Sequence, residues 1–571
     1  MSAGREMSPV AGPDRQRRPG GEASPEPGRP PSGWDVPRAV RLAAALAGLA
    51  ITAAYLAIAL SRLTYPFTIE WLESNSLVEV HRILAGQPLY AAPTAGYVPD
   101  GYPPLYFATS AAVASVLGVS YLPLRLVSLV SSLACFAVAA RLVQRETGSA
   151  GAGMAAAGVL AGTYFATGTW FDVGRVDSLF LALSVAALYM ARWMRRSRGA
   201  VAAGLLLGAA FLTKQTGLAE GVAVLTALAC SPRRRLAGPA ALAYGAVLGI
   251  STLVLGLTSH GWYIYYVVEQ MSGHALNYAA LEGFWTVFLL PTLGIAGCAL
   301  VLGARRTPLV LLAGCAALVA EGYATLVHSG GTGNDLLPAY LVVALLAGLA
   351  MGGQRGGLAG GCVDRLARAR NPDWRPGRVG RWVAAAAAAL VIAQMAVLAS
   401  GFQPARAIPT SADRSVGRSL TAGIRALGGT VAVPSDPGLD LMAGLSPVAQ
   451  QDAAADVLRG SDRAAIASFT RSTARAVAMR RFSAIITELN SDLHGFPPDL
   501  ARSYHRCPQT LLPGVPHAVF RPVAGVRARP VSVWLPNGHG SCATAVRALD
   551  GPATGTSTTQ SRQPRRPGGA A

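Results

Sequence analysis

Two carboxylates three residues apart follow the first long apolar segment of the chain. Glu70 and Glu73 stand in the run Thr-Ile-Glu-Trp-Leu-Glu, and residues at i and i+3 share one face of a helix. A carboxylate beside a low-dielectric surface can act as a general base toward a hydroxyl, or it can hold a metal. The same pattern suits a solvated helix start, where acids interact favourably with the helix dipole. The sequence predicts catalytic candidates here and leaves the choice between the two glutamates open.

Basic side chains stand at the ends of two later apolar segments and could bind an anion. Arg175 lies between Asp172 and Asp177, at the start of one segment, and Lys214 is the only lysine in the chain. Charged groups of this kind at a membrane boundary suit a lipid phosphate. Two ordinary alternatives stay open, because an aspartate often caps a helix and a lysine often extends its ammonium to the interface.

Three further places offer candidate substrate-binding residues. Asp100 and Tyr102 precede a Pro-Pro pair, which also fits a simple turn. His274 lies in the loop 258–283, whose aromatic residues equally fit an interfacial belt. Asn334 and Asp335 end a glycine-rich turn, where backbone N–H groups can face an anion. That turn lacks the lysine of a phosphate-binding P-loop.

The composition indicates which elements must position these residues. The chain has 571 residues, of which 52% are hydrophobic and 14% charged, and its mean hydropathy is +0.38. A soluble domain is nearer a quarter charged, so a polytopic, all-α membrane protein is expected. The net charge of +20 comes almost wholly from arginine. We attribute it to cytoplasmic loops rather than to nucleic-acid binding.

Eleven apolar segments are predicted to cross the bilayer, and 104–119 is expected to lie along its outer surface as a juxtamembrane helix. With this assignment the arginine clusters all fall on the cytoplasmic side. The N-terminus is then cytoplasmic and the C-terminus is outside. The eleven segments are 39–62, 121–143, 150–170, 178–194, 200–213, 217–230, 237–257, 284–303, 308–327, 336–353 and 382–400.

The chain is expected to have four parts. A disordered cytoplasmic tail (1–37) precedes a transmembrane domain (38–400), whose first external loop is 63–120. An extracytoplasmic α/β domain (401–548) and a disordered end (549–571) follow. The α/β domain should contain strands at 430–433, 483–487, 517–522 and 531–535 and helical structure over 449–480. Cys507 and Cys542 could form a disulfide there, because that side of the membrane is oxidising.

Together these motifs resemble the GT-C superfamily of membrane glycosyltransferases, including bacterial proteins similar to protein O-mannosyltransferases and to the lipid A aminoarabinose transferase. The resemblance covers about residues 39–400. It rests on the order of short motifs at 86–90 (Gly-x-Pro-Leu-Tyr), 102–106 (Tyr-Pro-Pro-Leu-Tyr), 175–177 (Arg-Val-Asp), 213–216 (Thr-Lys-Gln-Thr) and 333–338 (Gly-Asn-Asp-Leu-Leu-Pro).

The resemblance implies a catalytic acid in the first external loop, at Glu73 or Glu70, and a second acidic motif ending at Asp177. It also implies that basic side chains, with Lys214 as the match, hold the phosphate of a polyprenyl-phosphate sugar. The chain departs from the family in lacking an Asp-Glu pair after the first span. It also has Tyr102 where a lysine or histidine commonly precedes Pro-Pro.

The resulting hypothesis is an inverting membrane glycosyltransferase that acts on the outer face of the cell membrane. The donor is a polyprenyl-phosphate sugar, and the acceptor is a cell-envelope glycan, lipid or protein. Arg175 joins Lys214 at the phosphate, and a divalent cation stays open. A lipid or small-solute transporter is the alternative. It should carry internal repeats and charges deep in its spans, whereas here most charges gather at the outer ends, with Glu220 and Glu321 as exceptions.

Overall fold

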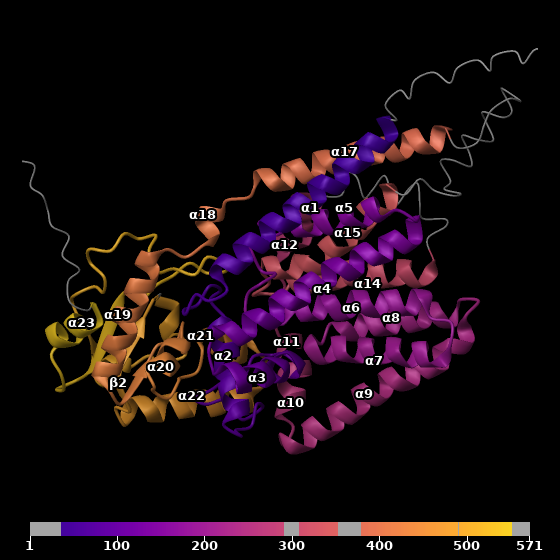
Figure 1. The fold of residues 1–571 in the computed structure, drawn as a ribbon. Helices are drawn as coiled ribbons and strands as arrows, with labels where there is room; N and C mark the ends of the chain where they lie inside the picture. The colour runs from indigo at the N-terminus through magenta and orange to yellow at the C-terminus, as the bar shows by residue number, and fades with distance from the viewer. Residues whose placement is uncertain (1–35, 290–307, 352–377, 489, 551–571) are drawn as a thin grey trace, which may run out of the picture.

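The computed structural model describes residues 36–289, 308–351, 378–488 and 490–550. A helical bundle forms one end of the molecule and an α/β part the other, with α2 and α3 at their junction (Figure 1). The predicted disordered ends, 1–37 and 549–571, fall almost wholly outside the described residues. The last two thirds of the expected span 284–303 also do.

Within the described ranges, eleven helices make up the bundle and its junction with the α/β part. Their bounds are α1 Val36–Arg62, α2 Glu73–Leu84, α3 Leu105–Leu117, α4 Tyr121–Thr147, α5 Ala150–Gly162, α6 Asp177–Trp193, α7 Ser197–Thr213, α8 Gly217–Ala229, α9 Ala237–Thr258, α14 Leu309–Leu326 and α15 Leu337–Met351. A further long helix, α17 (Arg378–Ser400), runs beside α1 (Figure 1). Short helical turns connect them: η1 Arg234–Leu236, α10 Trp262–Ile264, η2 Tyr265–Glu269, α11 Gln270–Ser272, α12 Tyr278–Gly283, η3 Phe284–Leu289 and η4 Gly333–Leu336.

The prediction of eleven spans is not confirmed. Five helices among the described residues are long and apolar enough to cross a bilayer, or six if the bent pair 384–400 and 404–427 forms one span. Where the expected segments lie within the described residues they form helices for most of their length, but several of these are short: α5 and α8 have 13 residues each. At 1.5 Å per residue such a helix is about 20 Å long, less than the roughly 30 Å of a hydrocarbon core. The chain is nevertheless a multi-pass membrane protein.

Small residues allow the helices to approach closely. A Cβ added at Gly158 of α5 would lie 2.1 Å from the Cα of Gly48 in α1, and one added at Gly204 of α7 would lie 2.2 Å from the carbonyl oxygen of Ala240 in α9. Close backbone contact through glycine and alanine is how membrane helices pack in the absence of a hydrophobic driving force between them. The abundance of these two residue types therefore has a structural explanation.

The α/β part is built around a four-stranded sheet of order β1-β2-β4-β3. Strand β1 (Thr430–Ala432) is parallel to β2 (Phe482–Thr487), and β4 (Ser532–Pro536) is antiparallel to both β2 and β3 (Tyr504–Arg506). The remaining elements are α18 Pro404–Ala407, α19 Ser411–Leu427, α20 Gly438–Met442, α21 Gln451–Arg459, α22 Arg463–Ala478, η5 Asn490–Leu493, η6 Leu500–Arg502 and α23 Cys542–Asp550.

Two local predictions for this part were wrong. Residues 517–522 form turns rather than a strand, since Pro516 and Pro522 at the two ends of the run cannot donate to a sheet ladder. The helical stretch 449–480 is broken into α21 and α22, because the Asp462 side chain accepts a hydrogen bond from the backbone N–H of Ala464 and starts a new helix. The expected disulfide between Cys507 and Cys542 is confirmed.

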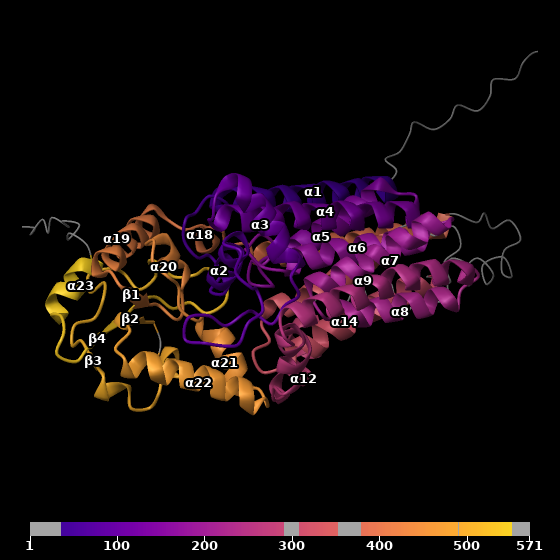
Figure 2. The same ribbon diagram turned by 90° about the horizontal axis from the view of Figure 1, so that it is seen from below.

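The α/β part is joined by backbone contacts to the segment 63–120 that follows α1. The amide of Val523 donates to the carbonyl of Ile69 at 2.8 Å, and Glu70 forms an isolated parallel bridge with Ala524. Trp71 packs so closely on Gly525 that a Cβ there would lie 2.0 Å from the indole ring. The segment that carries both candidate glutamates is thus held between the bundle and the α/β part (Figure 2).

Candidate active site

Glu73 is the first residue of α2, and both oxygens of its carboxylate accept hydrogen bonds. Its carboxylate receives two hydrogen bonds from Arg125 of α4, at 3.0 and 2.7 Å, and others from the amides of Gly174, Ile69 and Glu70. Both side chains are fully buried. Burial alone would raise the pKa of Glu73, but Arg125 and these amides lower it below its ordinary value. Such a carboxylate is a weak base, and the pair ties the first external loop to α4.

Glu70 has the opposite environment. It is also fully buried, yet among the described residues no donor makes a hydrogen bond of good geometry to either carboxylate oxygen; the backbone amide of Leu72 lies close enough only to lower its pKa slightly against burial. Its nearest cation is Arg175, whose Nε lies 3.9 Å from Oε2. Burial raises the pKa of Glu70 well above its ordinary value, Arg175 opposes this shift, and Glu73 adds to it. A carboxylate of this kind can take up a proton at a working pH nearer neutrality.

Arg175 lies between Glu70 and Asp100 and is not saturated by either. Its Nη1 is 3.7 Å from Asp100, and Nη2 donates a hydrogen bond of 3.2 Å to the hydroxyl of Tyr102. The guanidinium is only 3% exposed. Asn75 donates to the other oxygen of Asp100 at 2.6 Å, while burial raises the pKa of Asp100. Arg175 therefore keeps N–H groups free for a planar, bidentate partner such as a phosphate.

A second charged group surrounds Lys214, which ends α7. Its ammonium lies 3.1 Å from Asp177 at the start of α6 and 3.5 Å from Asp335 at the start of the helix leading into α15. Asn334 donates to the same oxygen of Asp177 at 3.2 Å. Tyr102 interacts electrostatically with both Arg175 and Lys214. The two groups therefore form one continuous site at the end of the bundle nearest the α/β part.

One other buried ion pair near the site is saturated. The guanidinium of Arg62 binds both oxygens of Asp172, at 2.7 and 2.6 Å, and also donates to the carbonyls of Thr169 and Ala407. Tyr164 donates to the same carboxylate. This pair has no group left for a ligand, so its role is to hold the end of α1 against the turn before α6.

His274 is the one candidate that lies apart from this cluster. Its Nε2 is 3.2 Å from the backbone oxygen of Asp456 in α21. Met271 and Gln270, on the same loop, lie against Gly101, where an added Cβ would be 3.0 Å from each. The loop covers the site and joins it to the α/β part, and the structure gives His274 no contact with the charged groups.

Sequence reasoning missed several residues that complete the site. Asn75 and Glu79 on α2 hold the side chain and the amide of Asp100, and the i, i+4 spacing of these two residues could have indicated a shared face. Gln215 donates to the carbonyl of Gly101 at 2.8 Å. Arg125 had a clearer signal, because an arginine inside an apolar segment needs a buried partner. No sequence signal pointed to Asp456, which lies over 270 residues after Arg175 in the chain.

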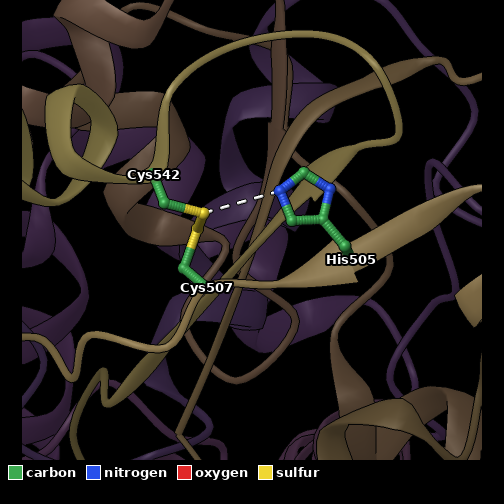
Figure 3. A group of neighbouring side chains, drawn as sticks. All are labelled: His505, Cys507 and Cys542. Carbon is green, nitrogen blue, oxygen red and sulfur yellow. Dashed lines mark hydrogen bonds between the residues drawn. A yellow bond between two sulfur atoms is a disulfide. The ribbon is translucent and has the colours of Figure 1, made fainter.

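The described residues do not form a ready metal site at this place. Within them, the one set of three or more potential ligand atoms within 4.8 Å of one another is His505, Cys507 and Cys542. Figure 3 shows that the two sulfurs are bonded to each other, with Nε2 of His505 3.5 Å from Sγ of Cys542. At the charged cluster the cation between the carboxylates is Arg175 itself. We therefore derive no catalytic step through a metal.

Comparisons with known proteins show which chains this one resembles. Residues 101–262 match the family model described as dolichyl-phosphate-mannose-protein mannosyltransferase. ArnT from Cupriavidus metallidurans bound to undecaprenyl phosphate is 15% identical, with a TM-score of 0.53 over 88% of this chain and 99% of that one. Its apo state gives 14% and 0.53 over 88% and 98%. AglB from Archaeoglobus fulgidus gives 13% and 0.45 over 91% and 78%.

A search of curated proteins by sequence finds no match. At these identities the structural likeness shows a shared fold. The resemblance to GT-C glycosyltransferases that use polyprenyl-phosphate sugars, expected from the sequence motifs, is confirmed by the family model and by the ArnT fold.

Proposed function

We propose that the chain is an inverting glycosyltransferase that moves a sugar from a polyprenyl phosphate to an acceptor hydroxyl of the cell envelope. The observation that carries the proposal is the unsaturated cluster of Glu70, Arg175 and Asp100. These are buried charged groups that the fold leaves without full sets of hydrogen bonds. Native proteins pair such groups unless the site has another use for them.

Arg175 and Lys214 are the proposed ligands of the donor phosphate. Both are buried at the end of the bundle, where a lipid phosphate at the membrane surface can reach them. ArnT, which shares the fold, binds undecaprenyl phosphate. The raised pKa of Asp100 allows this carboxyl to hold a proton, so that it does not fully cancel the charge of Arg175. Tyr102 and Asn334, between and beside the two cations, would orient the sugar phosphate.

Glu70 is the proposed base. The acceptor hydroxyl gives its proton to Glu70 as its oxygen attacks the anomeric carbon, and the bond from that carbon to the phosphate oxygen breaks on the opposite face. The phosphate leaves with the electron pair, and its developing charge is stabilised by Arg175 and Lys214 in a low-dielectric site. Asp177 and Asp335 hold Lys214 in position for this role. Attack from the opposite face inverts the anomeric centre.

The site is proposed to face the outside of the cell. It lies at the end of the bundle next to the α/β part (Figure 1). The arginine-rich ends of α4 and α6 lie at the opposite end, where Arg192 pairs with Glu146 and Arg145 lies over Trp193. Because arginine accumulates on the cytoplasmic side, the α/β part and its disulfide are assigned to the outside.

The test measures sugar transfer from a radiolabelled polyprenyl-phosphate sugar pool in membranes and donor binding to purified protein. Glu70→Gln should lower transfer by about 10²–10⁴-fold, the usual contribution of a general base, while donor binding is retained. Arg175→Gln should weaken donor binding. Glu282→Gln, an exposed carboxylate of α12, is the matched control and should change neither. Near-normal transfer by Glu70→Gln would refute its role as base, and a folded protein that binds no polyprenyl phosphate would refute the donor class.

A further inference from the structure

A cavity lies between the first external loop and the α/β part, on a different side of segment 65–71 from the charged cluster. Its volume is about 270 Å³, close to the lower end of the range for small-ligand sites, which is about 300–1,000 Å³. A single sugar unit fits such a space, whereas a lipid chain or a folded peptide does not. The walls come from segment 65–71, α21, the pair 435–436, Glu488, His494 and the stretch 520–528.

Asp436 is the unsatisfied group in this cavity. It is 7% exposed, and its Oδ2 accepts a hydrogen bond of 2.6 Å from the hydroxyl of Thr68. The backbone amides of Gly438 and Leu439 lie close enough to lower its pKa, but among the described residues no donor makes a hydrogen bond of good geometry to Oδ1. A buried carboxylate oxygen without a donor is costly, so the cavity offers a strong binding position to a ligand that brings an O–H or N–H group.

Two more carboxyls line the same cavity and determine the charge it accepts. Burial raises the pKa of Asp436 to about 6 and the pKa of Asp452 to about 7. Burial also raises the pKa of Glu488 well above its ordinary value, and the nearby Asp436 and Asp452 add to this shift. Arg521 opposes the shift of Glu488, and Arg459 pairs with Asp456. Carboxyls already repelling one another disfavour an anionic ligand.

The remaining lining fits a sugar better than a bare cation. The oxygen atoms of the three cavity carboxyls do not all lie within 4.8 Å of one another, as the ligands of a single metal ion would; among the described residues only His505, Cys507 and Cys542 do. Two arginines and a histidine also line the cavity, Arg459, Arg521 and His494, and Arg459 pairs with Asp456. The other walls carry aromatic side chains and uncharged hydrogen-bonding groups: Tyr65, Phe67, Trp71, Phe520, Ser435 and Gln451. Hydroxyl groups can donate to the carboxylates, and apolar C–H faces can lie against aromatic rings.

The cavity is connected to the charged cluster through two elements. Segment 65–71 carries Thr68 and Trp71 on the cavity and Glu70 in the cluster. Helix α21 likewise places Asp452 on the cavity, while Asp456 is close enough to Arg175 and Asp100 for their charges to interact. Figure 2 shows α21 at the junction of the two parts. A ligand in the cavity would therefore lie beside the reacting groups.

We propose that this cavity is the acceptor subsite and that it binds a sugar residue that carries no negative charge, either neutral or amino-substituted. That the bound sugar is the acceptor rests on the proposed glycosyltransferase function. The binding itself does not.

The test applies the fluorescently labelled full-length protein, in lipid nanodiscs, to an array of neutral, amino and uronic oligosaccharides. Neutral or amino glycans should be retained and uronic glycans should not. Asp436→Asn keeps the shape but removes the charge, and should weaken retention about ten- to a hundredfold, as expected for a lost hydrogen bond to a charged group. Ala455→Trp, on α21 at the cavity wall, should abolish it by filling the space. Asp499→Asn, an exposed carboxylate of the same part, is the matched control.

Retention of no glycan, a preference for uronic glycans, or unchanged retention in either cavity variant purified as monodisperse protein would overturn the proposal. Glu70→Gln separates this result from the proposed function, because that variant should bind glycans on the array normally while losing transfer. If glycans bind as expected but no variant or wild-type protein transfers sugar, the subsite stands as a glycan-binding site and the proposed enzymatic function fails.

Discussion

The contrast between Glu73 and Glu70 gives a prediction in which stability and activity change separately. Glu73→Gln removes the charge from a fully buried pair and leaves the guanidinium of Arg125 without a counter-ion. The new amide N–H₂ group would also face donors where the carboxylate accepted hydrogen bonds from Arg125, Gly174 and Ile69. Breaking a buried pair by removing one partner costs about 3–5 kcal/mol. Glu70→Gln removes a charge that makes no hydrogen bond and should cost little.

The assay compares apparent Tm in detergent with sugar transfer for both variants. Glu73→Gln should lower Tm by roughly 3–10 °C, and the protein that stays folded should keep more activity than Glu70→Gln. Glu70→Gln should keep or raise Tm while losing transfer. An unchanged Tm for Glu73→Gln, together with a loss of transfer as large as that of Glu70→Gln, would refute the assignment of Glu73 to a structural role.

Three further outcomes are expected. The transfer rate should rise with pH and level off at a pH above the ordinary range of a glutamate, because Glu70 has a raised pKa and accepts a proton only when ionised; a rate that is flat from pH 5 to 8 would count against it. Asp436→Asn should raise Tm relative to the wild type at pH 7.5 and not at pH 4. The pKa of Asp436 is about 6 in the folded state, above its unfolded value, so the wild type loses stability as pH rises from the unfolded to the folded pKa. A cysteine introduced at Ser411, exposed at the start of α19, should react with an impermeant thiol reagent on intact cells, whereas the native Cys230 should react only after lysis.

The positions of the helices could be predicted from the sequence, but the number of spans could not. Apolar runs mark where α4 and α14 lie, because burial in lipid requires them. Whether a 13-residue helix such as α8 crosses depends on its tilt and on its neighbours, which no local pattern records. In the α/β part, β1 and β2 follow β-rich runs, while β3 has three residues and two exposed side chains, too little signal to detect.

Of the candidate site residues, those near membrane boundaries could be found because ionisable groups there are costly and therefore noticeable. The geometry that distinguishes their roles could not be found from the sequence. Glu70 and Glu73 have the same residue type, the same segment and nearly the same burial. They differ in their contacts: Glu73 accepts hydrogen bonds from Arg125 of α4, 52 residues away in sequence, and from the amide of Gly174, 101 residues away. Asp436 and Asp456 come from a part of the chain whose composition gave no link to the membrane site.

The three buried arginines of this end of the molecule show why saturation distinguishes structure from function here. Arg62 and Arg125 each donate to a carboxylate at 2.6–3.0 Å and to backbone carbonyls, so their burial is compensated within the fold. Arg175 is equally buried but stands 3.7–3.9 Å from its carboxylates. A fold selected only for stability would close such gaps, since a partly satisfied buried charge is worse than a fully satisfied one. These distances are longer than a hydrogen bond, and among the described residues the Nε–H group of Arg175 is left unpaired. The proposed donor phosphate would accept a hydrogen bond from it and so complete the site.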